Sequence, residues 1–467
     1  MSFTSITFAG FFLLVLALYW SLRRKTWQNV VLLVASYIFY GWASPWVALL
    51  LGISTVVDFF IALGMQRSPA RSRALLWLSL VLNLGVLSFF KYYNFFSLPI
   101  SAQLAQLGIP MDIFLVSIAL PAGLSFYTLK KLAYILDVSR GTYKPVTNFI
   151  DFALFVSFFP QVISGPIDRA QKLIPQLQSA RAWKGQYFAS AWPLLVMGLF
   201  KKLVVADTVR SLVDRIYTIA VPSKFLVGIA ALGFTLQILA DFSAYTDLSR
   251  GAAWLLGFDT SINFNLPYLA LTPSEFWNRW HITLSSFLRD YIFFPLRRAL
   301  LKKRTLPDWL VQSLPPLVTM FVSGLWHGAG LTYLVWGIYY GVLIVIYQAA
   351  GIRGDWKPNN KLALFGAWLV MFSLIVFGWM LFRAPSMDWI GMALFKAPWL
   401  TSPRDLVIGL VVLCVLVVYS LPLILKLLLD RFTLPGSWWQ AAFFALITVA
   451  IIVYTNSSNS DFIYFQF

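Results

Sequence analysis

The sequence predicts an all-α polytopic integral membrane protein, with about 11–13 hydrophobic helices that include re-entrant or interfacial segments. Hydrophobic residues make up 60% of the chain and charged residues 12%, and the mean hydropathy is +0.76. Soluble globular proteins do not have this composition. Apolar runs long enough to cross about 30 Å of hydrocarbon recur from end to end. These runs are 7–22, 26–42, 46–65, 74–96, 113–129, 149–165, 189–209, 226–240, 310–326, 331–350, 362–382, 405–429 and 437–455.

The chain is expected to form a single membrane domain, residues 1–467. No polar stretch approaches the length that a separate soluble core would need. The run 7–22 is interpreted as the first span and not as a removed signal peptide, because further apolar runs follow it at once. The single cysteine, Cys414, lies inside an apolar run, which excludes an internal disulfide and a cluster of thiolate metal ligands.

Charge predicts how the chain is oriented. Lys and Arg number 36 against 18 Asp and Glu, a formal net charge of +18. In a soluble protein this excess would suggest nucleic acid. In a membrane protein it is explained by cytoplasmic loops and anionic lipid, so no nucleic-acid partner is expected. Basic clusters occur at 23–25, 67–73, 130–144, 297–304, 353–361 and 426–431. Placed in the cytoplasm, they put the N-terminus and the tail 456–467 on the extracytoplasmic side.

Polar and charged residues enter the apolar segments mainly between 121 and 340. The features are the pair Lys130 and Lys131, the segment "FPQVISGPIDR" (159–169) with its Pro and Gly breaks, and the helical stripe Asp241, Tyr245 and Ser249. Each one alone is explained by helix–helix hydrogen bonding or by a lysine that reaches an interface. Together they favour a polar cavity or tunnel at membrane depth.

The first of the two histidines, His281, lies in "SEFWNRWHITLSSFLRD" (274–290). The spacing predicts one amphipathic helix that starts near Pro273. Its apolar face would hold Phe276, Trp280, Leu284, Phe287 and Tyr291, and its polar face Glu275, Asn278, His281, Ser285 and Arg289. Such a helix would lie at the interface or enter the membrane as a re-entrant element, with its polar face toward protein or water.

The second histidine, His327, lies in "SGLWHGAGLTYLVWG" (323–337), where glycines surround it. Glycine lets backbones and slender ligands approach closely. A neutral imidazole can take a proton from a hydroxyl, and desolvation would keep it neutral. The alternative is a buried histidine that hydrogen-bonds a neighbouring helix. Two histidines without an HxxxH pair or a cysteine cluster fall short of a metal site, so no metal is expected. The chain also has no GxSxG elbow.

The two histidine segments together resemble the signature pair of the membrane-bound O-acyltransferase (MBOAT) family. "GLSFYTLKKLAYILDVSRG", "FPQVISGPIDR", "KKLVVADTV", "DFSAYTDLSRGAAWLLGF" and the ending "FIYFQF" are similar to its bacterial AlgI-like branch. That branch includes alginate acetylation proteins and PatA-type peptidoglycan O-acetyltransferases, with the DltB alanylation protein as a more distant relative. The resemblance extends over nearly the whole chain. The pair Lys130–Lys131 departs from it, because this branch often has uncharged residues there.

The resemblance implies helices around a central tunnel, in a multi-pass protein of the bacterial inner membrane. It implies that His327 is catalytic and that His281 lines the same reaction chamber. Asn278, Trp280, Trp326 and Ser285 are the candidate chamber residues. The expected activity is O-acetyl transfer from cytoplasmic acetyl-CoA, without a metal, toward an extracytoplasmic polysaccharide such as peptidoglycan or alginate. Basic residues at 297–304 could attract the phosphates of the donor, although topology explains them equally well.

The tail "FIYFQF" (462–467) adds a candidate acyl acceptor, Tyr464. A related motif in small partners of the DltB system has a tyrosine that is proposed to receive the acyl group. The hypothesis is a relay from acetyl-CoA through Tyr464 to a periplasmic SGNH-type acetyltransferase. The alternative is an aromatic anchor that packs the tail at the interface.

Three other functions stay open at this point. Transfer of D-alanyl or another acyl group to a cell-envelope polymer would use the same residues. A polytopic transporter would also have intramembrane charges and broken helices, but it would more often show two similar halves, and 1–230 does not correspond to 231–467. A purely structural subunit of an export complex would need neither histidine.

Overall fold

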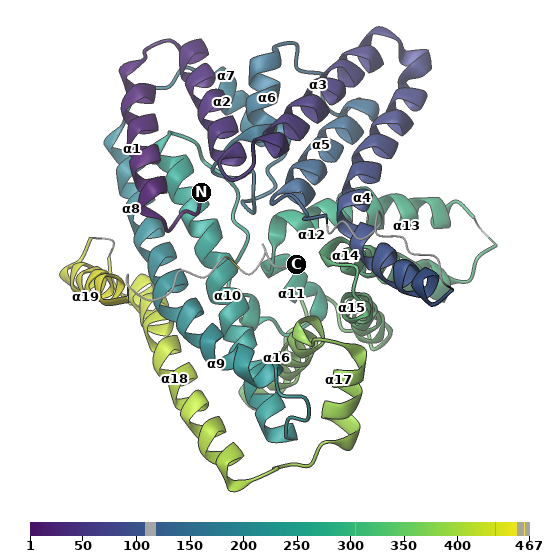
Figure 1. The fold of residues 1–467 in the computed structure, drawn as a ribbon, viewed down its shortest axis with the longest axis vertical. Coiled ribbons are helices and arrows are strands. Elements are labelled where there is room, and N and C mark those ends of the chain that lie inside the picture. The colour runs from purple at the N-terminus through teal and green to yellow at the C-terminus, as the bar shows by residue number, and fades with distance from the viewer. Residues whose placement is uncertain (108–117, 304, 435, 455–461, 463–467) are drawn as a thin grey trace. The chain divides into compact units, whose positions relative to one another are not determined.

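The computed structural model describes residues 1–107, 118–303, 305–434, 436–454 and 462. Regular secondary structure in these residues is helical throughout, which confirms the predicted all-α class. The longer helices (Figure 1) are α1 (Ile6–Ser21), α2 (Lys25–Gly41), α3 (Pro45–Arg67), α4 (Ser72–Gln106), α5 (Leu124–Ser139), α6 (Phe149–Ser157), α7 (Ala170–Gln178), α8 (Gly185–Leu199), α9 (Asp207–Tyr217), α10 (Lys224–Leu255), α14 (Asp308–His327), α15 (Leu331–Ala349), α16 (Lys361–Arg383), α18 (Pro403–Phe432) and α19 (Trp438–Tyr454). The short helices are α11 (Pro273–Arg279), α12 (Ile282–Leu288), α13 (Phe294–Leu301) and α17 (Met387–Gly391).

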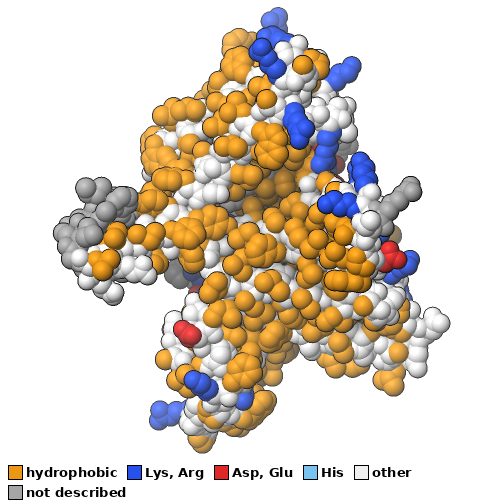
Figure 2. Space-filling view, turned by 90° about the vertical axis from the view of Figure 1, so that its right-hand side faces the viewer, with side chains coloured by type: hydrophobic (Ala, Val, Ile, Leu, Met, Phe, Trp, Pro, Cys, Tyr) orange, Lys and Arg blue, Asp and Glu red, His pale blue; other side chains and the backbone are white. Residues whose placement is uncertain are grey.

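Among the described residues, seven helical stretches are long and apolar enough to cross a membrane. They are Pro45–Arg67, Pro69–Ser101, Gly185–Tyr217, Lys224–Leu255, Leu331–Ala349, Lys361–Arg383 and Pro403–Phe432. Two shorter apolar helices, α1 and α19, join them. Hydrophobic side chains also cover most of the face shown in Figure 2. Exposed apolar side chains of this extent fit a surface in contact with lipid, so the chain is a multi-pass membrane protein.

Two apolar runs of the sequence, 113–129 and 149–165, are only partly helical in the described residues. The run 149–165 forms only the nine-residue helix α6, after which the chain leaves the helix at Phe158. The Pro- and Gly-containing segment 159–169 that follows is turn and coil, as predicted. The run 113–129 is described from residue 118 onward, and its helix α5 begins at Leu124. The interruption of the run 149–165 was predicted from the Pro and Gly residues of 159–169.

The residues pack as two compact units, and the division runs through α8 and α10. Unit 1 comprises Met1–Ala191 and Ser249–Ser261, and unit 2 comprises Trp192–Leu248 and Ile262–Phe467. Each unit is described here by itself. The prediction of a single domain stays a prediction.

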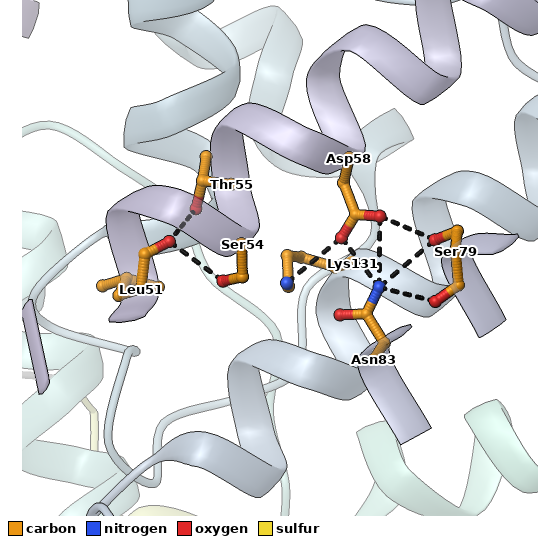
Figure 3. Close-up of polar contacts among 7 residues, drawn as sticks. All are labelled: Leu51, Ser54, Thr55, Asp58, Ser79, Asn83 and Lys131. Carbon is orange, nitrogen blue, oxygen red and sulfur yellow. Dashed lines mark hydrogen bonds and ion pairs between the residues drawn. The ribbon is translucent and has the colours of Figure 1, made fainter. Parts of the chain in front are cut away.

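Unit 1 contains a buried ion pair between α3 and α5 (Figure 3). The Lys131 ammonium lies 3.1 Å from the Asp58 carboxylate, and each side chain is 1% exposed. The carboxylate also accepts hydrogen bonds from the Ser79 hydroxyl at 2.6 Å and from the Asn83 amide, both on α4. Three helices therefore share one polar cluster inside an apolar unit, where water is not available to replace a lost partner.

The neighbouring lysine, Lys130, is also buried in unit 1. Its ammonium donates to the Gln161 side chain at 2.9 Å, and the Gln161 amide donates to Asp168 at 2.6 Å. Asp168 in turn accepts from the backbone N–H of Ser261. The network joins α5 to the segment 159–169. The Lys130 ammonium is therefore hydrogen-bonded inside the protein.

The core of unit 2 is rich in aromatic side chains. Trp280, Trp336 and Trp379 are among its largest fully buried residues. Helices α14 and α15 pack closely there because Gly324 and Gly337 face one another. A β-carbon on Gly324 would come within 2.4 Å of the Tyr333 carbonyl, and one on Gly337 within 2.4 Å of the Met320 carbonyl. The glycines of the second histidine motif therefore serve close backbone approach, as expected.

Candidate active site

The first histidine segment begins with a well-formed helix start. Thr272 caps α11, and its hydroxyl accepts from the backbone N–H of Glu275 at 3.1 Å. The Glu275 carboxylate reaches back to the N–H of Leu271 at 2.8 Å and pairs with Arg279 at 2.9 Å. This arrangement is close to a capping box, in which a cap side chain and an acidic residue three positions later satisfy free backbone donors. It confirms that the helix starts at Pro273.

The segment 274–290 is not one helix, and that prediction was wrong. α11 ends at Arg279, α12 starts at Ile282, and His281 between them has φ 41° and ψ 53°. In the described residues, Leu266 and His281 are the non-glycine residues with positive φ. For such a residue this left-handed conformation costs about 1–3 kcal/mol and persists only where surrounding contacts enforce it.

The contacts that hold this break come from a segment earlier in the chain. The Asn265 N–H donates to the Arg279 carbonyl, and the Ile282 N–H donates to the Asn263 carbonyl, both at 3.0 Å. The Asn263 side chain also accepts from the Thr283 hydroxyl at 2.7 Å. These hydrogen bonds end helix α11 on one side of His281 and begin helix α12 on the other side. Asn263 has no periodic signal in the sequence, and the prediction missed it.

The break turns His281 away from the predicted polar face. Its side chain is 1% exposed and lies against aromatic rings, 4.8 Å from Phe242 and 6.2 Å from Trp326 between ring centroids. Burial lowers the pKa of His281 to about 3. The imidazole is therefore neutral at physiological pH, because desolvation disfavours its charged form.

His327 is the last residue of α14 and is 6% exposed. Its ring centroid lies 4.9 Å from Trp326, 5.0 Å from Trp336 and 5.2 Å from Phe382. The Trp326 ring contacts His281 as well. The fold therefore brings the two histidines of the sequence to the same tryptophan, in a largely apolar setting.

The other predicted chamber residues separate into two places. Asn278 and Ser285 line a cavity of about 160 Å³ together with Trp277 and Arg289. Trp280 is buried in the aromatic core, 4.6 Å from Trp379 between ring centroids. Among the described residues, the lining of the cavity does not include either histidine.

Tyr464, the candidate acyl acceptor, lies outside the described residues. Phe462, two positions before it, is described and buried. Its ring lies 5.0 Å from the Tyr245 ring and 4.5 Å from the Lys202 ammonium. Lys202 lies in a π-helical turn, Phe200–Ala206, and pairs with Asp207 and Asp241 at 2.9 Å each. The stripe residues Asp241 and Tyr245 therefore face the site of Phe462.

The sequence comparisons identify the family. Residues 34–382 match the model of the MBOAT family, the membrane-bound O-acyltransferase family, and this range contains both histidines. The chain belongs to the membrane-bound O-acyltransferase family. The resemblance that its motifs predicted is thereby confirmed, and the transporter and structural-subunit alternatives give way to an acyltransferase.

Individual relatives of this O-acyltransferase have several acceptor polymers in their names. The probable alginate O-acetylase AlgI of Pseudomonas aeruginosa is 36% identical over 391 residues, which are 83% of this chain and 73% of that protein. The peptidoglycan O-acetyltransferase of Helicobacter pylori is 31% identical over 417 residues, 83% of this chain and 76% of that protein. The teichoic acid D-alanyltransferase of Bacillus subtilis is 26% identical over 272 residues, 56% and 68% of the two chains.

Membership in this family implies an acyl donor as a substrate of the O-acyltransferase. Within the described ranges, no group of three or more His, Cys, Asp or Glu side chains is placed to hold a metal ion. The residues that the structure does bring together are imidazoles and aromatic rings in buried surroundings. Neutral imidazoles can exchange protons with a hydroxyl or a thiol, so the arrangement suits proton transfer during acyl transfer.

The O-acyltransferase should lose stability on acidification through His281, which lies outside the seven candidate spans. Its pKa is about 3 when folded, below the value of about 6.5 expected when unfolded. The unfolded chain therefore binds the extra proton between these values, and stability falls as pH falls from 6.5 toward 3. The loss should be about 2 kcal/mol between pH 7.5 and pH 5.

Thermal unfolding in detergent at several pH values checks this expectation against His281→Gln, which lacks the titrating group. The stability of the wild type relative to the variant should decrease as pH falls. A stability difference that stays constant from pH 7.5 to pH 5 would show that His281 is not held neutral.

Proposed function

We propose that this O-acyltransferase moves an acetyl group from cytoplasmic acetyl-CoA across the membrane for O-acetylation of an extracytoplasmic polysaccharide. The main observation behind the proposal is that the rings of His281 and His327 both contact the Trp326 ring. The named activities of the alginate and peptidoglycan relatives support acetyl transfer to a cell-envelope polymer. The host membrane in this proposal is the bacterial inner membrane, with both termini extracytoplasmic.

In the proposed reaction His327 is the general base. Its imidazole takes the proton of the acceptor hydroxyl, and the hydroxyl oxygen attacks the thioester carbonyl carbon. The carbon–sulfur bond then breaks, and the departing thiolate takes the proton back from the imidazolium. The products are an acetyl ester and free coenzyme A. The acetyl group is neither oxidised nor reduced, so no further reactant is needed.

His281 has a different role in this proposal. A neutral imidazole has one N–H, and that donor can stabilise the negative oxygen that develops on the thioester carbonyl. The low pKa of His281 supports a role as a neutral donor rather than as a second cation. Its enforced left-handed backbone supports a fixed orientation of the ring.

The cavity beside α11 and α12 is the proposed location of part of the donor. Asn278, Ser285 and Arg289 contribute polar groups to its wall, and the Arg289 guanidinium lies 3.4 Å from the Asn278 amide oxygen. A guanidinium favours phosphate oxygens, which coenzyme A carries. Helix α13, which begins after the turn Arg289–Phe293, contains Arg297 and Arg298. These residues support binding of a phosphorylated donor from the cytoplasm.

Direct assay tests the function. The purified chain in proteoliposomes receives acetyl-CoA with a labelled acetyl group, and both coenzyme A release and the labelled acceptor are measured. An acetyltransferase releases coenzyme A in step with acceptor labelling. If a D-alanyl thioester on a carrier protein is used and acetyl-CoA is not, the alternative of alanyl transfer replaces the proposal.

The role proposed for Tyr464 is an acyl relay, in which its hydroxyl receives acetyl and passes it to a periplasmic SGNH-type acetyltransferase. The burial of Phe462 against Tyr245 inside unit 2 is compatible both with this relay and with a simple aromatic anchor. Tyr464→Phe keeps the aromatic ring and removes the hydroxyl.

A relay predicts that Tyr464→Phe lowers transfer to the final acceptor by at least about 10²-fold, since the nucleophile is lost. Mass spectrometry of the C-terminal peptide during turnover should find an acetyl group on Tyr464 in the wild type. Full transfer by the variant would leave the anchor as the role of the tail.

A further inference from the structure

An ion pair joins the end of α16 to α9 within unit 2. Arg383 is the last residue of α16, and its guanidinium donates to the Asp214 carboxylate at 2.6 Å. The guanidinium also lies 5.1 Å from the centre of the Tyr217 ring. The second oxygen of Asp214 pairs with Arg210 on α9 at 3.1 Å. Both arginines and the carboxylate are partly buried, so the pairing is stronger than that of a fully exposed pair.

The residue before Arg383 contacts the proposed base directly. Phe382 is 1% exposed, and its ring centroid lies 5.2 Å from that of His327 and 5.0 Å from that of Tyr333. It also contacts Trp336 at 5.3 Å, and Trp336 contacts His327 from another direction. Phe382 thus forms one wall of the imidazole site.

This wall belongs to the last helical turn of α16, whose residues Met380 and Leu381 are buried in the same core. Beyond Arg383 the helix ends, and Ala384 makes a single closing hydrogen bond to the Met380 carbonyl. Terminal turns fray easily unless a side chain holds them, and a cation in the last turn also interacts favourably with the helix dipole. The Arg383–Asp214 ion pair restrains this turn by joining it to α9.

We propose that Arg383 is a positioning residue for His327: its ion pair with Asp214 fixes the last turn of α16, and Phe382 in that turn holds the imidazole. This inference rests on the catalytic role proposed for His327. The pair contributes no group to the reaction itself. A small displacement of a base can reduce turnover strongly, because proton transfer depends on alignment.

Kinetics of acetyl transfer test the inference through Arg383→Met. The expected result is a fall in kcat of roughly ten- to a hundredfold with little change in KM for the donor. Arg383→Lys keeps the charge and should retain most of the activity. Asp214→Asn should match Arg383→Met, and the double variant should lose no more than the worse single variant, because both remove one interaction. Arg215→Met, which replaces an exposed arginine of the same helix α9, is the matched control and should stay within about twofold of the wild type.

A labelling experiment separates positioning from general destabilisation and does not depend on activity. Diethyl pyrocarbonate modifies imidazoles, and the chain has only two, His281 and His327. Peptide mass spectrometry gives the rate at each. Arg383→Met should raise the rate at His327 by roughly threefold or more and leave His281 unchanged, because only one wall loosens. An equal rise at both histidines, or none at His327, would overturn the inference. If instead His327→Ala kept full activity, the catalytic role proposed for His327 would fail, while the labelling result would still stand.

Discussion

Replacing His327 with alanine is expected to reduce acetyl transfer by about 10²- to 10⁴-fold, the contribution of a positioned general base. The imidazole is buried among Trp326, Trp336 and Phe382, and alanine offers no atom that could accept a proton. His327→Gln preserves most of the volume and the polarity but not the basicity. We expect it to be as inactive as the alanine variant, which would separate proton transfer from packing.

Two comparisons make this experiment decisive. Gln312 lies on the exposed side of the same helix, so Gln312→Ala should transfer acetyl at the wild-type rate. Coenzyme A release and acceptor labelling are measured together, because loss of both places the defect at the chemical step. A fully active His327→Ala variant would refute the catalytic assignment and the mechanism built on it.

Replacing Asp58 with asparagine is expected to destabilise the protein by about 3–5 kcal/mol, because it leaves a buried ammonium without its counter-charge. Lys131 and Asp58 are each 1% exposed and lie 3.1 Å apart, and Figure 3 shows that the same carboxylate also binds Ser79 and Asn83. The variant therefore weakens the junction of three helices. Thermal or denaturant unfolding in detergent, followed by tryptophan fluorescence, measures the loss.

The matched control is an ion pair of the same residue types at the surface. Lys426 and Asp430 are one helical turn apart on α18, and Asp430 is half exposed. Asp430→Asn should cost less than about 0.5 kcal/mol, the usual range for such a pair. The double variant Asp58→Leu with Lys131→Met should be far more stable than Asp58→Asn, since it buries no charge. Equal losses for Asp58→Asn and Asp430→Asn would mean that the pair in unit 1 is hydrated.

The sequence predicted the fold class and most helices because a membrane protein must satisfy its backbone within each span. Apolar runs such as 362–382 and 405–429 therefore appear as α16 and α18 with nearly the same bounds. The helix start at Pro273 could also be predicted from the sequence, because capping depends on residues close together in the chain. The two histidine motifs gave the family, which the comparison with residues 34–382 confirmed.

Local pattern failed where distant residues decided the backbone. The spacing of 274–290 fits one amphipathic helix, yet Asn263 and Asn265 bind both sides of His281 and force a break there. Periodicity contains no information about a partner from another segment. The same holds for Phe382 and Arg383, which look like the unremarkable end of an apolar span until the structure places them beside His327 and Asp214.

The sequence by itself determined that this protein is a multi-pass membrane protein with two histidines in O-acyltransferase motifs. Only the tertiary structure decided that His281 leaves the polar side of its segment and meets His327 at Trp326, while Asn278 and Ser285 line a separate cavity. The reason is physical. Hydropathy and capping act over a few neighbouring residues, whereas a side chain's direction at a helix break is fixed by hydrogen bonds and ring contacts from remote parts of the chain.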